Sequence, residues 1–190
     1  DRRGTVASEG GGLVILESLD HARARNARIY AEDAGFGAAS NTVSWSAPDA
    51  KGRGLALALR KALADAATGI EQIDLVAPFG TATPGHDAAE IMAWNEVFAS
   101  RLDHAAALTT RGAVGINGAG SGAIDFAATV MALYRNTVPP SLNTATPDRA
   151  SRFKFIQGDP KDVRVGQAMS VGYALAGGQC AALVIKKVEG

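Results

Sequence analysis

Residues 52–76, GRGLALALRKALADAATGIEQIDLV, predict a helix that leads into a buried strand. Four apolar residues recur at the spacing of a single helix face, namely Leu55, Leu59, Ala62 and Leu63. The helix is expected over residues 52–68, and Gly69 is a typical residue for its end. The short apolar run that follows, residues 73–76, has the composition of a buried strand. A helix followed by such a strand is typical of an α/β protein.

The segments on both sides of this unit continue the alternation of helices and strands. Helices are expected at residues 20–26, 87–99 and 123–136, the first of them capped by Asp20. Strands are expected at residues 4–19, 28–39, 106–110, 163–171 and 179–187. Residues 13–16 are apolar on both faces, as in a strand that is covered from both sides. The sequence therefore predicts an α/β fold with a mixed sheet between helix layers.

Composition excludes several classes of protein. A chain of 190 residues is long enough for one domain with a substantial core. Nineteen basic residues balance nineteen acidic ones, which argues against a nucleic-acid binder or a polybasic membrane-surface protein. No apolar run approaches the ~18 residues of a transmembrane helix. The single cysteine, Cys180, excludes an internal disulfide framework and a cysteine-based zinc site, and we expect a buried, inert thiol in a cytoplasmic protein.

The glycine-rich segment at residues 111–122 lies between a strand and a helix, where a phosphate group could bind the amides of the helix start. Its glycines do not have the G-x-G-x-x-G spacing of dinucleotide-binding proteins, and no phosphate-binding G-x-x-x-x-G-K-[ST] motif occurs. Close packing of a helix on the sheet is therefore the favoured interpretation. A module that binds a nucleotide or a coenzyme A derivative stays a minor alternative.

The histidines form no catalytic constellation in the sequence. We expect His21 and His104 to be solvated, because both lie among charged residues. His86 is followed by Asp87, but neighbouring side chains at a helix start point in different directions, so capping is favoured over a catalytic dyad. Trp45 is unusual for a polar loop, and it either packs against another surface or anchors the loop locally.

Five collinear stretches carry a resemblance to a known family. They are DRRGTVASEGGGLVILESLDHARARNARIYAE at 1–32, IDLVAPFGTATPGHDAAE at 73–90, TTRGAVGINGAGSGAID at 109–125, VPPSLN at 138–143 and ALAGGQCA at 174–181. Together they resemble the C-terminal half of the β-ketoacyl synthases, the condensing enzymes of fatty-acid and polyketide assembly. The resemblance implies a thiolase-like fold, with residues 1–190 as a C-terminal half-domain. It also implies that the N-terminal half, which carries the nucleophilic cysteine in the family, is absent from this chain, and that the first strand pairs with that half.

The departures from the family pattern fall on its catalytic positions. The two histidines of the family correspond to Phe79 and Ile116, neither of which has a polar side-chain atom. The family lysine corresponds to Arg111 and the family glutamate to Asp125, so an ion pair between them is expected as structure. The aromatic gate of the family corresponds to Ala176, so the acyl entrance beside Phe79 is expected to be either wider or refilled by another group.

The resemblance therefore predicts a chain-length-factor-type subunit that does not catalyse condensation. Such a subunit pairs with an active ketosynthase as a heterodimer and shapes the acyl tunnel. Thr81 and Thr83 keep the hydroxyl positions that contact the phosphopantetheine arm of an acyl carrier protein, which is the expected substrate carrier. No permanently bound cofactor and no metal ion are expected. The alternative is half of an active condensing or decarboxylating enzyme with relocated catalytic groups, such as His86 or Asn117.

Overall fold

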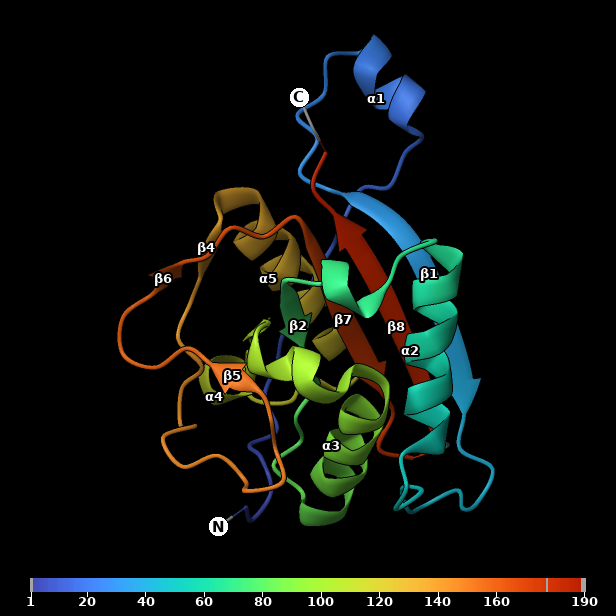
Figure 1. Cartoon of the computed structure of the whole chain (residues 1–190), viewed down its shortest axis with the longest axis vertical. Helices are drawn as coiled ribbons and strands as arrows, with labels where there is room; N and C mark the ends of the chain where they lie inside the picture. Colours follow the sequence, from blue (N-terminus) through green and yellow to red (C-terminus); the bar gives the residue numbers. More distant parts are fainter. Residues whose placement is uncertain (1, 177, 189–190) are drawn as a thin grey trace.

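The computed structural model describes residues 2–176 and 178–188. A six-stranded sheet organises this part of the chain, in the order β1-β8-β7-β2-β3-β5 (Figure 1). Its strands are β1 (Glu32–Ser40), β2 (Leu75–Ala77), β3 (Ala106–Ala107), β5 (Lys154–Phe155), β7 (Gln167–Tyr173) and β8 (Gln179–Lys186). The pairs β1–β8 and β8–β7 are antiparallel, whereas β7–β2, β2–β3 and β3–β5 are parallel. The expected mixed sheet is confirmed.

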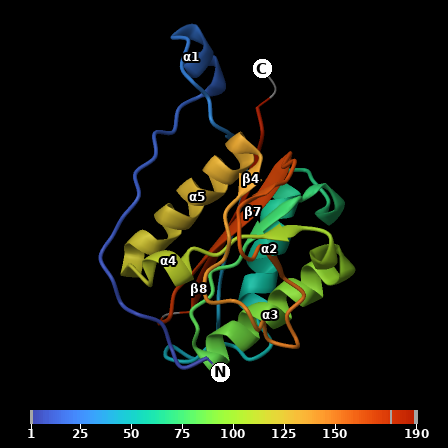
Figure 2. The ribbon, with the colours of Figure 1, turned by 90° about the vertical axis from the view of Figure 1, so that its left-hand side faces the viewer.

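Helices cover both faces of this sheet. Figure 2 shows α5 (Ser121–Arg135) on one face, and α2 (Arg53–Asp65) and α3 (Pro84–Phe98) on the other. Short elements complete the described fold: α1 (Leu19–Ala24), α4 (Arg111–Val114), 3₁₀ turns at Ile70–Gln72, Ala99–Asp103 and Gly118–Gly120, and an antiparallel ladder of β4 (Thr137–Val138) with β6 (Lys161–Asp162). No helix in the described ranges has the length and apolarity needed to cross a membrane.

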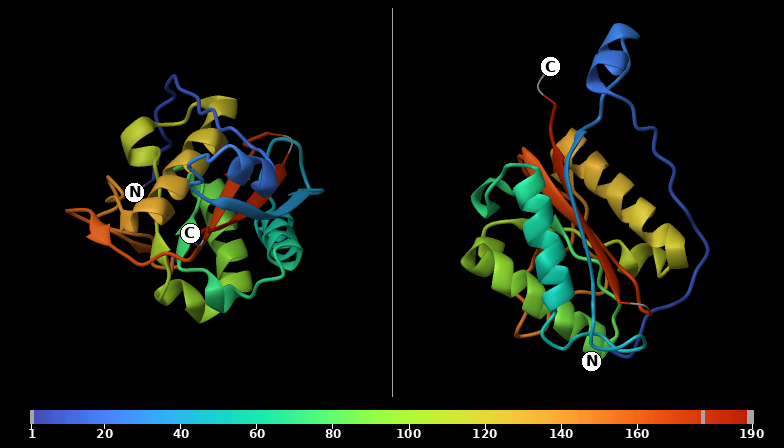
Figure 3. Two further views of the ribbon diagram at one scale, coloured as in Figure 1. Left: turned by 90° about the horizontal axis from the view of Figure 1, so that it is seen from above. Right: turned by 90° about the vertical axis from the view of Figure 1, so that its right-hand side faces the viewer.

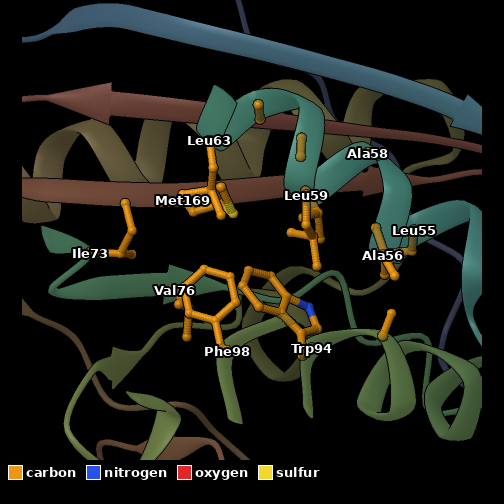
Figure 4. Close-up of a cluster of buried hydrophobic side chains, with 14 of the residues drawn as sticks. Leu55, Ala56, Ala58, Leu59, Leu63, Ile73, Val76, Trp94, Phe98 and Met169 are labelled. Carbon is orange, nitrogen blue, oxygen red and sulfur yellow. The ribbon is translucent and has the colours of Figure 1, made fainter. Parts of the chain in front are cut away.

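Each face of the sheet has its own apolar core. On the α2 and α3 side, Leu59, Trp94 and Phe98 are completely buried, and the two aromatic rings lie 5.0 Å apart (Figure 4). On the α5 side, Leu75 and Leu133 are completely buried in a second cluster. The sheet is thus held between helix layers, as the sequence predicts.

Small residues allow α2 to lie directly on β1. A Cβ atom at Gly37 would be 2.1 Å from the carbonyl oxygen of Ala58, and one at Gly35 would be 2.5 Å from the amide nitrogen of Ala66. Real Cβ atoms essentially never make contacts this short. The backbones of α2 and β1 can therefore lie this close together only because both strand positions are glycine. The high glycine and alanine content of the chain has a structural role at this contact.

Several sequence predictions need correction. Residues 4–19 form no strand of either sheet, and their only ladder contact in the described part is an isolated bridge between Ala7 and Ile116. Leu13 is 87% exposed, so no described residue covers most of its side chain. Helix α1 is capped by Ser18, whose hydroxyl accepts from the His21 amide at 3.3 Å, and not by Asp20.

Boundaries and side-chain environments also differ in places. Strand β3 has only two residues because the chain turns into α4 soon afterwards, and β7 begins at Gln167 rather than at residue 163. The prediction that His21 and His104 are solvated is confirmed. Trp45 is 75% exposed, so its interpretation as a local anchor is wrong. Residues 1 and 177, which belong to two of the family-like stretches, lie outside the described residues.

Candidate functional site

The candidate site lies where the loop after β2 meets helix α4. Phe79 belongs to this loop, and its side chain is buried. The guanidinium carbon of Arg111, the first residue of α4, lies 4.6 Å from the centre of the Phe79 ring. The Nε atom of Arg111 also donates a hydrogen bond to the Phe79 carbonyl oxygen at 3.0 Å. A cation–π contact and a hydrogen bond therefore join the same two residues.

The Arg111 side chain is fixed at its other end by Asp125 of α5. The two side chains are about 5% exposed and form an ion pair. Thr110 donates its hydroxyl to the second carboxylate oxygen of Asp125 at 2.6 Å, and Arg111 also donates to the Gly115 carbonyl at 2.9 Å. Burial raises the pKa of Asp125 to about 6, although hydrogen bonds from Thr110 and Arg111 and the charge of Arg111 oppose that shift. The ion pair expected from these substitutions is present.

Ile116 is held by hydrogen bonds of its backbone. Its amide donates to the Val6 carbonyl at 2.9 Å, and its carbonyl accepts from the Ser8 amide at 2.9 Å. The side chain itself is hydrocarbon. The positions of Phe79 and Ile116 therefore offer no side-chain group that donates a hydrogen bond or transfers a proton.

Two carboxylates of α3 hold the loop in place: Asp87, which the sequence suggested only as a capping residue, and Glu90, which it did not single out. Glu90 accepts the amide protons of Phe79 at 2.7 Å and Gly80 at 2.9 Å. Asp87 accepts the next amide, that of Thr81, at 2.7 Å. Three consecutive backbone amides are thus bound by carboxylates three residues apart on one helix face. This D-x-x-E spacing was the available signal in the sequence.

Glu90 is a buried acid without a cationic partner among the described side chains. It is 3% exposed, and its remaining hydrogen bond comes from the Trp94 indole at 3.3 Å. Burial raises the pKa of Glu90 to about 7, while the backbone hydrogen bonds lower it. Both protonation states of this carboxyl are therefore accessible near neutral pH.

The two threonines have different environments. Thr81 is completely buried, its hydroxyl donates to Asp87 at 2.9 Å and it accepts from the Thr83 amide at 3.1 Å. Thr83 is the N-cap residue of α3 and is partly exposed. A role in contacting a phosphopantetheine arm stays a prediction for both, and Thr83 is the more accessible of the two.

The fallback catalytic residues have separate neighbours. His86 Nε2 lies 3.3 Å from the Leu175 carbonyl oxygen, and its ring meets the edge of Tyr173. Asn117 donates to the Ser8 hydroxyl at 2.7 Å. Within the described residues no hydrogen bond joins His86 to Asn117. Neither His86 nor Asp87 caps α3, since both lie after its N-cap residue.

Ala176 lies in the turn between β7 and β8, and Cys180 lies just after it. Ala176 is exposed, and its role as the former gate stays a prediction. Cys180 lies in β8 and is 4% exposed. Burial raises the pKa of its thiol to about 12, and the charge of Glu90 adds to the shift. Within the described residues no group of three or more His, Cys, Asp or Glu side chains could hold a metal ion.

The Cys180 thiol is expected to react with iodoacetamide at pH 8 roughly a thousandfold more slowly than a free cysteine, because so little thiolate is present. The measurement is the rate of mass increase of the folded protein. Unfolding in urea is the control, and it should restore the rate of an ordinary thiol. Rapid labelling of the folded protein would contradict the buried environment.

The mixed sheet, the helix layers on both faces and the family-like loops around Arg111 define a thiolase-like α/β domain of the ketosynthase type. Residues 30–145 match the family described as Beta-ketoacyl synthase, C-terminal domain. The match covers more than half of the sequence. The chain therefore belongs to the β-ketoacyl synthase family, as a C-terminal domain.

Individual relatives agree with this assignment. The chain is 31% identical over 187 residues to the 3-oxoacyl-[acyl-carrier-protein] synthase 2 of Coxiella burnetii, covering 98% of this chain and 45% of that protein. It is 33% identical over 189 residues to the protein of the same name from Synechocystis sp., with 100% and 45% covered. A solved structure described as the ishigamide ketosynthase/chain length factor aligns with a TM-score of 0.92 and 27% identity over 100% of this chain and 46% of that chain. This chain spans less than half the length of these relatives.

Proposed function

We propose that this chain is the C-terminal half of a chain-length-factor-type subunit that completes and shapes the acyl tunnel of a β-ketoacyl synthase complex without catalysing condensation. One observation supports the proposal: the two positions that the resemblance assigns to the family histidines hold Phe79 and Ile116, and the Phe79 ring is packed under Arg111. In enzymes that stabilise an oxyanion, the loss of one hydrogen-bond donor costs ~2.7–4 kcal/mol of transition-state stabilisation. A site that lacks both donors is poorly suited to condensation.

The proposal requires polypeptide partners. Leu13 and Ile15 are at least 80% exposed, and an apolar segment of this kind usually lies in an interface. We assign it to contact with an N-terminal half of the same fold, which together with this chain pairs with an active ketosynthase. The name of the Coxiella relative includes an acyl carrier protein, which supports a carrier-protein partner for the complex. We also propose that the complex is located in the cytoplasm.

Co-purification and product analysis test the proposal. We expect this chain to co-purify with an N-terminal half and a ketosynthase subunit, and we expect product formation to depend entirely on the nucleophilic cysteine of that ketosynthase. Products are measured by mass spectrometry of the loaded carrier protein. A stable lone monomer would contradict the proposal.

Replacement of His86 or Asn117 by alanine tests the alternative of an active half with relocated groups. The proposed function predicts that His86→Ala and Asn117→Ala leave product formation unchanged, because neither residue then takes part in bond formation. The measurement is the product yield of the complex per unit time. Condensation that survives removal of the partner's cysteine and is lost in His86→Ala would show that this chain is catalytic.

A further inference from the structure

We propose that Lys61 and Asp65 of α2 block the free edge of β1 and thereby prevent two copies of this chain from pairing edge to edge. The surface concerned consists of the outward backbone groups of residues 34–40 and is called the β1 edge. It lies outside the candidate site. This role of the two side chains therefore does not depend on the proposed function.

The β1 edge has the features of a strand that recruits another strand. β1 has nine residues, is the longest strand of the described sheet and pairs there with β8 alone. Figure 1 and the right-hand view of Figure 3 show β1 at the rim of the sheet, with α2 alongside. Residues 34–40, AGFGAAS, contain no charge and no proline. An open edge of this kind pairs with a further strand unless something covers it.

Two side chains of α2 bind the backbone at this edge. The Asp65 carboxylate accepts the Phe36 amide proton at 2.9 Å, and the Lys61 ammonium group donates to the Ala38 carbonyl oxygen at 3.0 Å. Residues two apart in a strand present their N–H and C=O groups to the same side, so the two hydrogen bonds lie along one edge. One donor and one acceptor of the β1 edge are therefore already occupied.

The two side chains also fill the space that an added strand needs. Lys61 and Asp65 lie four residues apart, which places them on one face of α2, and both are exposed. The close approach of α2 at Gly35 and Gly37 fixes the helix beside the strand, so both side chains stay within reach of the edge. A neighbouring strand would lie about 4.8 Å from β1, where it would have to displace both hydrogen bonds.

The regular part of β1 is the part that these side chains protect. The register with β8 shifts between Asp33 and Gly35, as at a β-bulge. An irregularity of this kind bends and twists a strand, which hinders pairing with a straight partner. Only the residues after the shift therefore offer a regular edge, and the hydrogen bonds from Lys61 and Asp65 lie there.

A second copy of the chain is the partner that fits the unprotected β1 edge. Two identical strands related by a twofold axis run antiparallel and present the same donors and acceptors to each other, so each edge completes the other. Main-chain hydrogen bonds supply the affinity in such a pair. Apart from Phe36, residues 34–40 have only small side chains, which do not obstruct the approach of a second backbone.

The test is sedimentation velocity of the assembly in which this chain is purified, at increasing concentration. We expect the double variant Lys61→Ala, Asp65→Ala to self-associate into a species of twice the mass at least about tenfold more strongly than the unsubstituted assembly. The matched control removes an exposed ion pair of 2.8 Å between α2 and α3, by Arg60→Ala with Glu96→Ala, and should leave association unchanged.

Hydrogen exchange of the Phe36 amide shows where the copies meet. In dilute Asp65→Ala this amide should exchange about tenfold faster than in the unsubstituted assembly, because it has lost its acceptor. Asp65→Asn keeps a side-chain oxygen that accepts a hydrogen bond, so it should change the rate less. In the concentrated double variant the Phe36 amide should become protected again, since the β1 edge is then paired.

Three results would overturn the inference. The first is a folded double variant that associates no more than the control with Arg60→Ala and Glu96→Ala. The second is an equal exchange rate of Phe36 in dilute Asp65→Ala and in the unsubstituted assembly, which would show that another chain already covers the edge. The third is association without renewed protection of Phe36, which would place the contact elsewhere. The exchange rate in Asp65→Ala decides the matter even where the double variant does not fold.

Discussion

Replacing Arg111 with alanine is expected to destabilise the folded protein by about 3–5 kcal/mol, the cost of removing one partner from a buried ion pair. Asp125 would keep its buried carboxylate but lose the charge that compensates it. The carbonyl oxygens of Phe79 and Gly115 would lose their hydrogen-bond donor in the same step. The measurement is urea denaturation of the purified protein, followed by circular dichroism.

The control is Arg152→Ala, because Arg152 pairs with Asp103 at 2.8 Å but both side chains are more than 40% exposed. We expect Arg152→Ala to lower the free energy of unfolding by less than about 1 kcal/mol.

The pH dependence of stability gives a second check on the Arg111–Asp125 pair. The pKa of Asp125 in the folded protein is already raised, and the loss of Arg111 raises it further, so the protonated form is favoured in the fold. The loss in free energy of unfolding caused by Arg111→Ala should therefore be largest above pH 7 and become smaller as the pH falls towards 4. An equal loss in free energy of unfolding for Arg111→Ala and Arg152→Ala would contradict the description of Arg111 and Asp125 as a buried ion pair.

Gly37→Ala is expected to lower the free energy of unfolding by about 3 kcal/mol, at the upper end of the range for overpacked cores. The added methyl group would lie 2.1 Å from the Ala58 carbonyl oxygen and 2.5 Å from the Ala62 amide nitrogen, so α2 would have to move away from β1. The measurement is the midpoint of thermal unfolding together with the free energy of unfolding in urea.

Gly172→Ala is the matched control for this substitution, since Gly172 also lies in the same sheet but has no atom within 4 Å of the added Cβ. We expect its free energy of unfolding to stay within about 0.5 kcal/mol of the unsubstituted protein. A Gly37→Ala protein that is as stable as Gly172→Ala would show that the helix and the strand are further apart than described.

The sequence predicted most of the fold because helix periodicity and apolar strands depend on local spacing. The apolar face of residues 52–68 and the alternation of elements were sufficient for the mixed sheet and its helix layers. Residues 4–19 form no strand in the described sheets, and their pairing with an N-terminal half stays a prediction. Their apolar pattern indicates that something covers them, but it does not state which polypeptide does so. Similarly, Ser18 and Asp20 are both good capping residues, and only the backbone geometry distinguishes them.

The candidate site was predicted in part. The resemblance selected Phe79, Arg111 and Asp125, and the structure brings these three residues together. The contact of the Asp87 and Glu90 carboxylates with the loop was missed, because their spacing indicates one face of a helix but not the loop that this face meets. Their role depends on the path of residues 79–81 across the start of α3, which is a tertiary feature.

The order of the sheet has a consequence for biosynthesis. In the described sheet β1 pairs only with β8, and about 140 residues separate the two strands along the chain. On the ribosome, β1 therefore waits for β8, its only strand partner in the described sheet, until the residues up to Lys186 have been synthesised. Contacts of such long range form slowly, because a large loop must close first. Until then the edge of β1 that later pairs with β8 has no partner among the described strands, so we expect a holding chaperone to improve the yield at this stage of synthesis.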